Sequence, residues 1–233
     1  MQAEKRYVMV IDLRHCLGCN TCVAACSQAN HTPEKLWRQV EDLGIVPQSG
    51  GVRLTIPVSC MHCEKPACLT VCPTGATKQR DGIVFVDADR CIGCGYCILA
   101  CPYRARVIYQ DQMDFEDERD DKSLSEAAER SGTCTKCDFC REHVAHGVSK
   151  GLLPGKDAEA SPACVVNCSA QVLSFGDLND PDSNVSRLMK THNTVRLAEE
   201  KGTKPQVYYI IDHCDTTIRD GELCQCQAPD STS

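Results

Sequence analysis

The apolar residues of this 233-residue chain fall in short runs separated by polar turns, without a long apolar stretch. Runs rich in β-branched and aromatic residues predict short strands. These strands are expected at residues 7–13, 52–58, 83–86 and 206–212. Short helices are expected directly after four of the chain's cysteines, namely Cys22, Cys68, Cys97 and Cys164.

Two polar segments interrupt this pattern. Residues 111–132 are acidic and poor in apolar residues, which predicts a surface loop. Residues 146–161 are rich in Gly, Lys and small residues and predict a second insertion. Further on, residues 180–183 resemble a helix start. The apolar face of this expected helix consists of Val185, Leu188 and Met189.

Composition indicates that side-chain burial alone does not hold the fold. Only 5% of the residues are aromatic, with one Trp and four Phe, so a core of large side chains would be small. Bound inorganic groups would supply the missing stabilisation, because ligand binding to a site absent from the unfolded chain is folding free energy. The net charge of −7 disfavours nucleic acid as a partner.

Neither a secretory signal nor a membrane span is expected. The N-terminal residues enter a strand-like run and then a cysteine motif, without an apolar stretch before a small-residue cleavage site. No apolar run approaches the roughly 20 residues that cross a bilayer. We therefore expect a soluble chain without an export signal of its own, in which the cysteines bind metal rather than form disulfides.

Sixteen of the twenty cysteines fall into four groups of four. Groups one and three have the spacing C-x2-C-x2-C-x3-C of bacterial two-cluster ferredoxins, and groups two and four are looser. The groups are Cys16, Cys19, Cys22 and Cys26; Cys60, Cys63, Cys68 and Cys72; Cys91, Cys94, Cys97 and Cys101; and Cys137, Cys140, Cys164 and Cys168.

This spacing indicates [4Fe-4S] clusters that are bound in pairs. A C-x2-C-x2-C loop wraps three corners of an iron–sulfur cube, and the fourth cysteine points away and ligates the neighbouring cluster. A zinc site instead presents two C-x2-4-C knuckles separated by a spacer. The rhythm of strand, motif and helix occurs three times and is partial at group four, which no strand is expected to precede. We interpret the chain as an internal repeat of a half-ferredoxin unit.

Four cysteines are left over. Cys134 precedes group four, and the other three lie in a polar C-terminal tail that is expected to be poorly ordered. We expect free, non-ligating thiols at all four positions, with a fifth metal site in the tail as the alternative. The remaining cysteines are Cys134, Cys214, Cys224 and Cys226.

The motifs resemble the iron–sulfur electron-transfer (beta) subunits of complex molybdenum enzymes, such as DMSO, polysulfide, thiosulfate and tetrathionate reductases. The resemblance spans about residues 9 to 210. It is carried by MVIDLRHCLGCNTC, CMHCEKPACLTVCPTGAT, DADRCIGCGYCILACPYRAR, KCDFC, SPACVVNC, GDLNDPDSNVSRLM and GTKPQVYYI. Two positions bear on it: Ser169 stands where the family often has Pro, and Cys97 stands where some relatives have Trp and a [3Fe-4S] cluster.

The resemblance implies four [4Fe-4S] clusters, because groups one and four face each other and groups two and three form an inner pair. Site a would then use Cys16, Cys19, Cys22 and Cys168. Site b would use Cys137, Cys140, Cys164 and Cys26. Site c would use Cys60, Cys63, Cys68 and Cys101, and site d would use Cys91, Cys94, Cys97 and Cys72.

The implied fold is α+β, with one ferredoxin-like module nested inside another. The outer module would comprise residues 1–50 and 134–212, and the inner module residues 51–110. An acidic surface insertion would occupy residues 111–133 and a C-terminal tail residues 213–233.

The implied function is electron relay, without catalysis on this chain. It would pass single electrons between a large catalytic subunit, with molybdenum or tungsten on a bis-pterin cofactor, and a quinone-reactive membrane subunit. The chain would be cytoplasmic, or exported with a signal-bearing partner, and peripheral to the membrane through its complex. A free polyferredoxin carrier and a zinc-bound scaffold are the competing hypotheses; the substrate and the direction of electron flow stay open.

Several charged residues close to the ligands are candidates for tuning the clusters, and an ordinary surface or supporting role is the alternative for each. These residues are His62, Lys65, Arg90, Lys136 and Arg141. His143 and His146 could form an extra metal pair, but two exposed loop histidines are the simpler interpretation.

Overall fold

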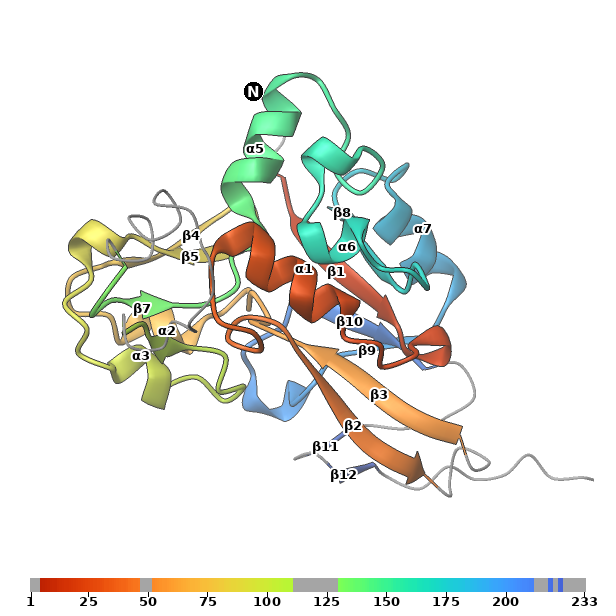
Figure 1. The fold of residues 1–233 in the computed structure, drawn as a ribbon, viewed down its shortest axis with the longest axis horizontal. Coiled ribbons are helices and arrows are strands. Elements are labelled where there is room, and N and C mark those ends of the chain that lie inside the picture. The colour runs from red at the N-terminus through yellow and green to blue at the C-terminus, as the bar shows by residue number, and fades with distance from the viewer. Residues whose placement is uncertain (1–4, 47–51, 111–129, 212–217, 220–221, 224–233) are drawn as a thin grey trace, which may run out of the picture.

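The computed structural model describes residues 5–46, 52–110, 130–211, 218–219 and 222–223. It has mixed helices and strands, as the sequence predicts, and most of the described strands pair in two-stranded sheets (Figure 1). The exception is one four-stranded sheet in the order β8-β1-β10-β9.

This sheet joins segments from the two ends of the chain. Its middle strand β1 (Tyr7–Asp12) pairs in parallel with β10 (Val207–Ile210) and antiparallel with β8 (Leu173–Asp177). Strand β9 (Thr194–Val195) pairs with the free edge of β10. The start of the chain is thereby fixed against the segment that follows the fourth cysteine group.

Successive side chains of β1 point to opposite faces of the sheet, and both faces are buried. Met9 and Ile11 point into the main core, where they join Phe175 and cysteines of the motif loops. Val8 and Val10 point the other way, into a smaller core under helix α7 (Asn184–Thr191). The cysteine loops therefore lie on one face of the sheet and α7 on the other.

Helix α7 confirms the expected helix start. Ser183 caps it, because its Oγ accepts a hydrogen bond from the Ser186 backbone N–H. Val185 is fully buried, and Leu188 and Met189 pack beside it on the expected face.

The remaining strands form two-stranded antiparallel pairs. The longest joins β2 (Gln39–Val46) to β3 (Val52–Val58), with a register shift between Asp42 and Ile45. The others are β4 (Thr77–Arg80) with β5 (Ile83–Val86), β6 (Val107–Ile108) with β7 (Cys134–Thr135), and β11 (Ile218–Arg219) with β12 (Glu222–Leu223).

The helices are short. Helix α1 (Thr21–Asn30) contains the last two cysteines of group one, and single turns occur at α2 (Ala67–Thr70), α3 (Tyr96–Leu99) and α6 (Ala163–Val166). Helix α5 (Arg141–Ser149) begins directly after Cys140. The 3-10 turns are η1 (Leu13–His15), η3 (Ala88–Arg90), η5 (Ala158–Ala160) and η6 (Glu199–Lys201).

The observed elements agree in part with the sequence predictions. The strands at 52–58 and 83–86 are confirmed, and the first and last strands are shorter than expected, at 7–12 and 207–210. The expectation that no strand precedes group four was wrong, since β7 does so and pairs with β6. His143 and His146 lie on α5 rather than on a loop. The acidic loop is outside the described residues apart from its last three, and so is most of the C-terminal tail.

Candidate metal-cluster sites

The four cysteine loops share one backbone feature. The residue directly before the second cysteine of each group has a positive φ, at Gly18, His62, Gly93 and Phe139. Glycine adopts this conformation without cost, whereas a bulky side chain there is strained. The shared left-handed turn supports the interpretation that the motifs are repeats of one structural unit.

The two strained residues of this set contact each other. The rings of His62 and Phe139 stack with centroids 3.7 Å apart, and both side chains are buried. The His62 Nδ1 accepts a hydrogen bond from the Val84 backbone N–H at 3.1 Å, which leaves the ring proton on Nε2. Burial lowers the pKa of His62 well below its usual value, and the nearby cations Lys136, Arg106 and Arg38 lower it further. This imidazole is therefore neutral.

The cysteines predicted for site c lie together. A small cavity, partly open to solvent, is lined by Cys60, Cys63, Cys68 and Cys101. Cys63 and Cys68 also interact electrostatically with Cys60 and with Cys101. The last cysteine of group three thus lies with the first three of group two.

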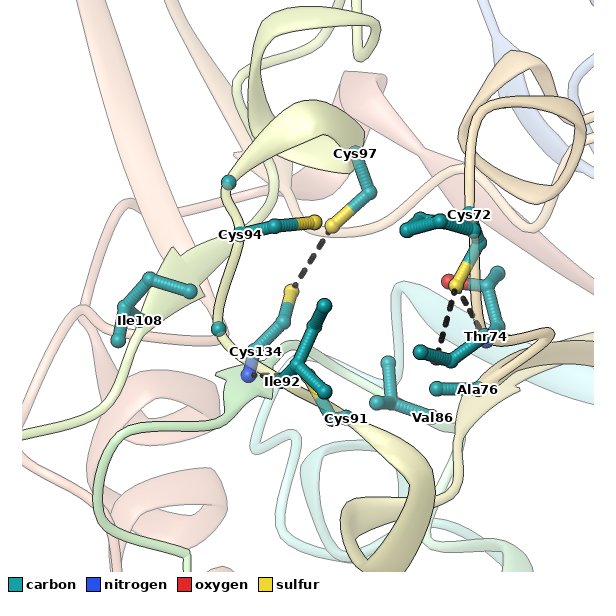
Figure 2. Close-up of a pocket in the computed structure, with 14 residues that line it drawn as sticks. Cys72, Thr74, Ala76, Val86, Cys91, Ile92, Cys94, Cys97, Ile108 and Cys134 are labelled. Carbon is teal, nitrogen blue, oxygen red and sulfur yellow. Dashed lines mark hydrogen bonds between the residues drawn. The ribbon is translucent and has the colours of Figure 1, made fainter.

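The cysteines predicted for site d line a second small cavity, also partly open to solvent. Figure 2 shows Cys72 approaching from one side and Cys91, Cys94 and Cys97 from the other. The Cys72 Sγ accepts a hydrogen bond from the Thr77 backbone N–H at 3.4 Å. Here the last cysteine of group two lies with the first three of group three.

A fifth cysteine lines the site d cavity. The Cys134 Sγ lies 3.5 Å from the Cys97 Sγ, and the Cys134 backbone N–H donates to the Cys91 Sγ at 3.3 Å (Figure 2). The S–S separation is a hydrogen-bond distance and far longer than the roughly 2.05 Å of a disulfide. The sequence does not predict that Cys134 lies at site d, because Cys134 is adjacent to group four in the chain.

At the predicted site a, Cys22 interacts electrostatically with Cys168 and Cys16. The Cys19 Sγ lies 3.8 Å from the hydroxyl of Ser169, the residue after Cys168. Ser169, where the family often has Pro, therefore contacts a predicted ligand. Cys19 is exposed, so this site reaches the surface.

At the predicted site b, Cys26 interacts electrostatically with Cys137, Cys164 and Cys140. The Asn30 Nδ2 lies 3.8 Å from the Cys26 Sγ and 3.7 Å from the Cys140 Sγ, so one amide contacts two of these sulfurs. Cys137 also interacts with Cys60 of site c. Sites b and c are therefore neighbours.

Burial favours the protonated form of three thiols at these sites. It raises the pKa of Cys22 and Cys63 to about 11 and that of Cys137 to about 12. Metal-ligating cysteines are thiolates, so iron binding at neutral pH must displace these protons. Exposed Cys19 differs, because its contact with the Thr21 hydroxyl lowers its pKa.

The sulfurs suit an extended cluster better than one ion. Within the described part of the chain, no three His, Cys, Asp or Glu side chains converge closely enough to hold a single metal ion. Instead, four cysteines surround an open space at site c, and five do so at site d. This arrangement fits a group with several iron corners.

Two buried arginines that no local sequence pattern singles out also contact the cysteine groups. Arg38 and Arg106 are 1% and 5% exposed. Burial would lower the pKa of each guanidinium, but surrounding cysteines raise it, with Cys164 and Cys68 the strongest contributors. Both side chains are charged.

The charged residues that the sequence suggests could tune the clusters differ in how deeply they are buried. His62 and Lys136 are buried, and the Lys136 Nζ donates to the carbonyls of Val84 and Cys137. Lys65 and Arg90 are exposed. The guanidinium carbon of Arg141 lies over the ring of Phe85, 4.3 Å from the ring centroid. His143 and His146 are exposed, and the His143 Nε2 lies 3.2 Å from the Ala158 carbonyl.

The remaining sequence predictions about sites concern the tail and the membrane. Cys214, Cys224 and Cys226 lie outside the described residues. Among the helices that the structure describes, none combines the length and the apolar character needed to cross a bilayer.

The chain matches two family models, both described as 4Fe-4S dicluster domains, over residues 15–76 and 52–117. It is 40% identical over 220 residues to a Halobacterium salinarum protein named as the iron-sulfur B subunit of a dimethyl sulfoxide reductase, a match that covers 88% of this chain and 78% of that protein.

Two further relatives bear different substrate names. The B subunit of selenate reductase from Mesobacillus selenatarsenatis is 39% identical, over 89% of this chain and 72% of its own length. The B subunit of tetrathionate reductase from Salmonella typhimurium is 37% identical, over 88% and 72%. These matches and the cysteine sites place the chain in the family of [4Fe-4S] electron-transfer subunits of the reductase complexes to which these relatives belong.

Proposed function

We propose that this chain binds four [4Fe-4S] clusters and relays single electrons between a molybdenum or tungsten bis-pterin catalytic subunit and a quinone-reactive membrane subunit. The observation that carries this proposal is that the fourth cysteine of each group lies near cysteines of another group. In our proposal, this exchange gives each cluster the four ligands that the resemblance implies. The sites are Cys16, Cys19, Cys22 and Cys168; Cys137, Cys140, Cys164 and Cys26; Cys60, Cys63, Cys68 and Cys101; and Cys91, Cys94, Cys97 and Cys72.

The contacts between sites support a linear order a, b, c, d. Cys137 of site b and Cys60 of site c interact, and the stacked rings of His62 and Phe139 belong to the same two loops. Exposed cysteines are found at the other two sites, Cys19 at site a and Cys94 at site d. When bound, the clusters supply one-electron redox chemistry. Electrons would then enter at one exposed site and leave at the other.

Exposed apolar side chains beside the two end sites support docking to partners. Leu17, next to Cys16, is 75% exposed. Around site d, Ile92, Tyr96 and Leu99 are exposed, Leu99 by 86%. Apolar side chains grouped on a surface commonly mark interfaces. We propose that one end docks the catalytic subunit and the other the second redox partner, so that the chain would reach the membrane only through its complex.

The same ligand exchange supports the nested arrangement. In our proposal, residues 1–50 and 134–212 form the outer module with sites a and b, and residues 51–110 form the inner module with sites c and d. Strand β7 lies at the proposed start of the second outer segment but pairs with β6 at the end of the inner one. The β6–β7 sheet therefore contains one strand from each proposed module.

Purification of the native complex under anaerobic conditions tests the function. We expect a large molybdenum- or tungsten-containing subunit to co-purify, and this chain to be brown with about sixteen irons. An iron-loaded chain that purifies without such a subunit would instead indicate a free polyferredoxin. A colourless chain that contains zinc would indicate a scaffold and contradict the redox function. The identity of the co-purifying subunit also decides the substrate.

A further inference from the structure

Each proposed module contains one buried arginine that faces cysteines of both of its cluster sites. Arg38 interacts electrostatically with Cys22 of site a and with three cysteines of site b, which are Cys164, Cys137 and Cys26. Arg106 interacts with Cys68 and Cys60 of site c, and with Cys97 and the neighbouring Cys134 at site d. The two arginines thus occupy corresponding places between paired sites.

The contacts of Arg38 are unusual for a guanidinium. Its Nη2 donates to the Met9 Sδ at 3.1 Å and to the Cys164 Sγ at 3.5 Å. The Nε and Nη1 atoms are buried and have no hydrogen-bond partner among the described residues. Sulfur is therefore the only class of acceptor that this side chain contacts in the described part of the chain.

Arg106 makes a related set of contacts in the inner module. Its Nη1 donates to the Thr77 Oγ1 at 3.2 Å and to the Cys134 Sγ at 3.6 Å. The Nη2 is buried without a hydrogen-bond partner among the described residues. The side chain therefore contacts Cys134, whose sulfur lies 3.5 Å from that of Cys97, and together with that thiol it also lowers the pKa of Cys97 itself.

A buried guanidinium with unpaired donors is costly unless an opposite charge compensates it. Among the described residues, no carboxylate lies within ion-pair distance of Arg38 or Arg106. Thiolates that ligate iron are the remaining source of negative charge next to both side chains. We propose that Arg38 and Arg106 are fixed counter-charges that raise the reduction potentials of the clusters, Arg38 at sites a and b and Arg106 at sites c and d.

Reduction adds one negative charge to a cluster, so a nearby fixed positive charge stabilises the reduced form. Low local polarity strengthens the effect, since both side chains are almost fully buried. One arginine per pair would also keep the two clusters of a pair close in potential. This inference rests on the cluster assignment proposed above.

Redox titration of the iron-loaded full-length chain, followed by electron paramagnetic resonance, tests the inference. We compare Arg38→Met and Arg106→Met, which remove the charge, with Arg38→Lys and Arg106→Lys, which keep it. At a fixed potential, each Met variant should lower the ratio of reduced to oxidised cluster about tenfold at two clusters, equivalent to about 59 mV. The two variants should affect different pairs. Arg53→Met is the control, because exposed Arg53 pairs with Asp42 on the β2–β3 hairpin.

The Lys variants separate charge from structure. Potentials close to wild type in the Lys variants support the proposal, and equal shifts in the Met and Lys variants overturn it. Unchanged potentials in the Met variants, or shifts of the same two clusters by both, also overturn it. If a Met variant loses iron, the corresponding Lys variant tests the proposal instead. Wild-type potentials in the Lys variant support the role of the arginine as a counter-charge, and loss of iron from the Lys variant contradicts that role. A wild-type chain without iron would refute the cluster assignment itself.

Discussion

Behind the cysteine loops of the proposed outer module lies a four-stranded sheet with both faces buried, whereas site d of the proposed inner module is lined by strand pairs of two to four residues per strand. Part of the proposed inner module packs into the main core, through Cys60, Met61 and Ile83. A separate small core lies beside site d, and three of its four buried members are cysteines, namely Cys68, Cys97 and Cys134 with Val84. The surroundings of site d therefore contain less apolar packing than the sheet of the proposed outer module.

The same contrast holds for the arginines. Arg38 of the proposed outer module contacts the proposed ligand Cys164, whereas Arg106 of the proposed inner module donates to the sulfur of Cys134. Together with the Cys134 thiol, Arg106 also lowers the pKa of the neighbouring proposed ligand Cys97, so the extra thiol is an additional neighbour of the inner arginine. The cysteine loops of the two proposed modules thus have different side chains around their sulfurs.

Removal of iron should give the largest difference between the modules. We expect amide hydrogen exchange in an anaerobically chelated chain to lose about tenfold more protection over residues 84–108 than in β1, β8 and β10. The reason is that the sheet keeps its buried faces without metal, whereas the small core beside site d consists mainly of cysteines. Equal loss of protection in both regions would contradict the comparison.

Loss of one exchanged ligand should empty one predicted site. In Cys72→Ser, we expect Cys91, Cys94 and Cys97 to become reactive towards iodoacetamide, because their cluster has lost its fourth ligand. Peptide mass spectrometry would locate the label. Cys60, Cys63 and Cys68 should stay protected. Labelling of the latter three instead would show that Cys72 serves site c and that the proposed exchange is wrong.

The extra thiol of the inner module offers a matched pair of variants. We expect Cys97→Ser to release the cluster at site d, and Cys134→Ser to keep the full iron content, because Cys134 is proposed to contact a ligand rather than to be one. Iron analysis of the two variants measures this difference. Loss of about a quarter of the iron in Cys134→Ser, with no loss in Cys97→Ser, would assign the ligand to Cys134.

The smallest expected effect concerns the conventional core of the outer module. Ser183→Ala removes the cap of α7 and should lower the free energy of unfolding by about 1 kcal/mol without loss of iron. Ser149→Ala, at the exposed end of α5, is the control and should cost less than about 0.5 kcal/mol. Thermal unfolding of the iron-loaded chains compares them. Loss of iron in Ser183→Ala would show that the back of the sheet also supports the metal sites.

Features with a local sequence signal could be predicted. The spacing of groups one and three indicated clusters, and β-branched runs predicted β3 and β5 correctly. The helix at Asn184–Thr191 followed from its capping residues and its apolar face. In each case a few consecutive residues carry the information.

Features that depend on distant contacts could not be predicted. Cys134 is adjacent to group four in the chain but lies at site d, because β7 pairs with β6 across the segment 111–129. Arg38 and Arg106 stand in ordinary polar surroundings in the sequence, and only the fold shows that both are buried among cysteines. Strand β8 was missed because its short run acquires a partner only from the N-terminal strand.

The central claim is that the exchanged cysteines hold four [4Fe-4S] clusters. Iron, acid-labile sulfide and zinc analysis of the anaerobically purified full-length chain, together with its Mössbauer spectrum, tests this claim most directly. We predict about sixteen irons and sixteen sulfides per chain, all in cubane clusters, and no stoichiometric zinc. About eight irons, or zinc in place of iron, would contradict the account.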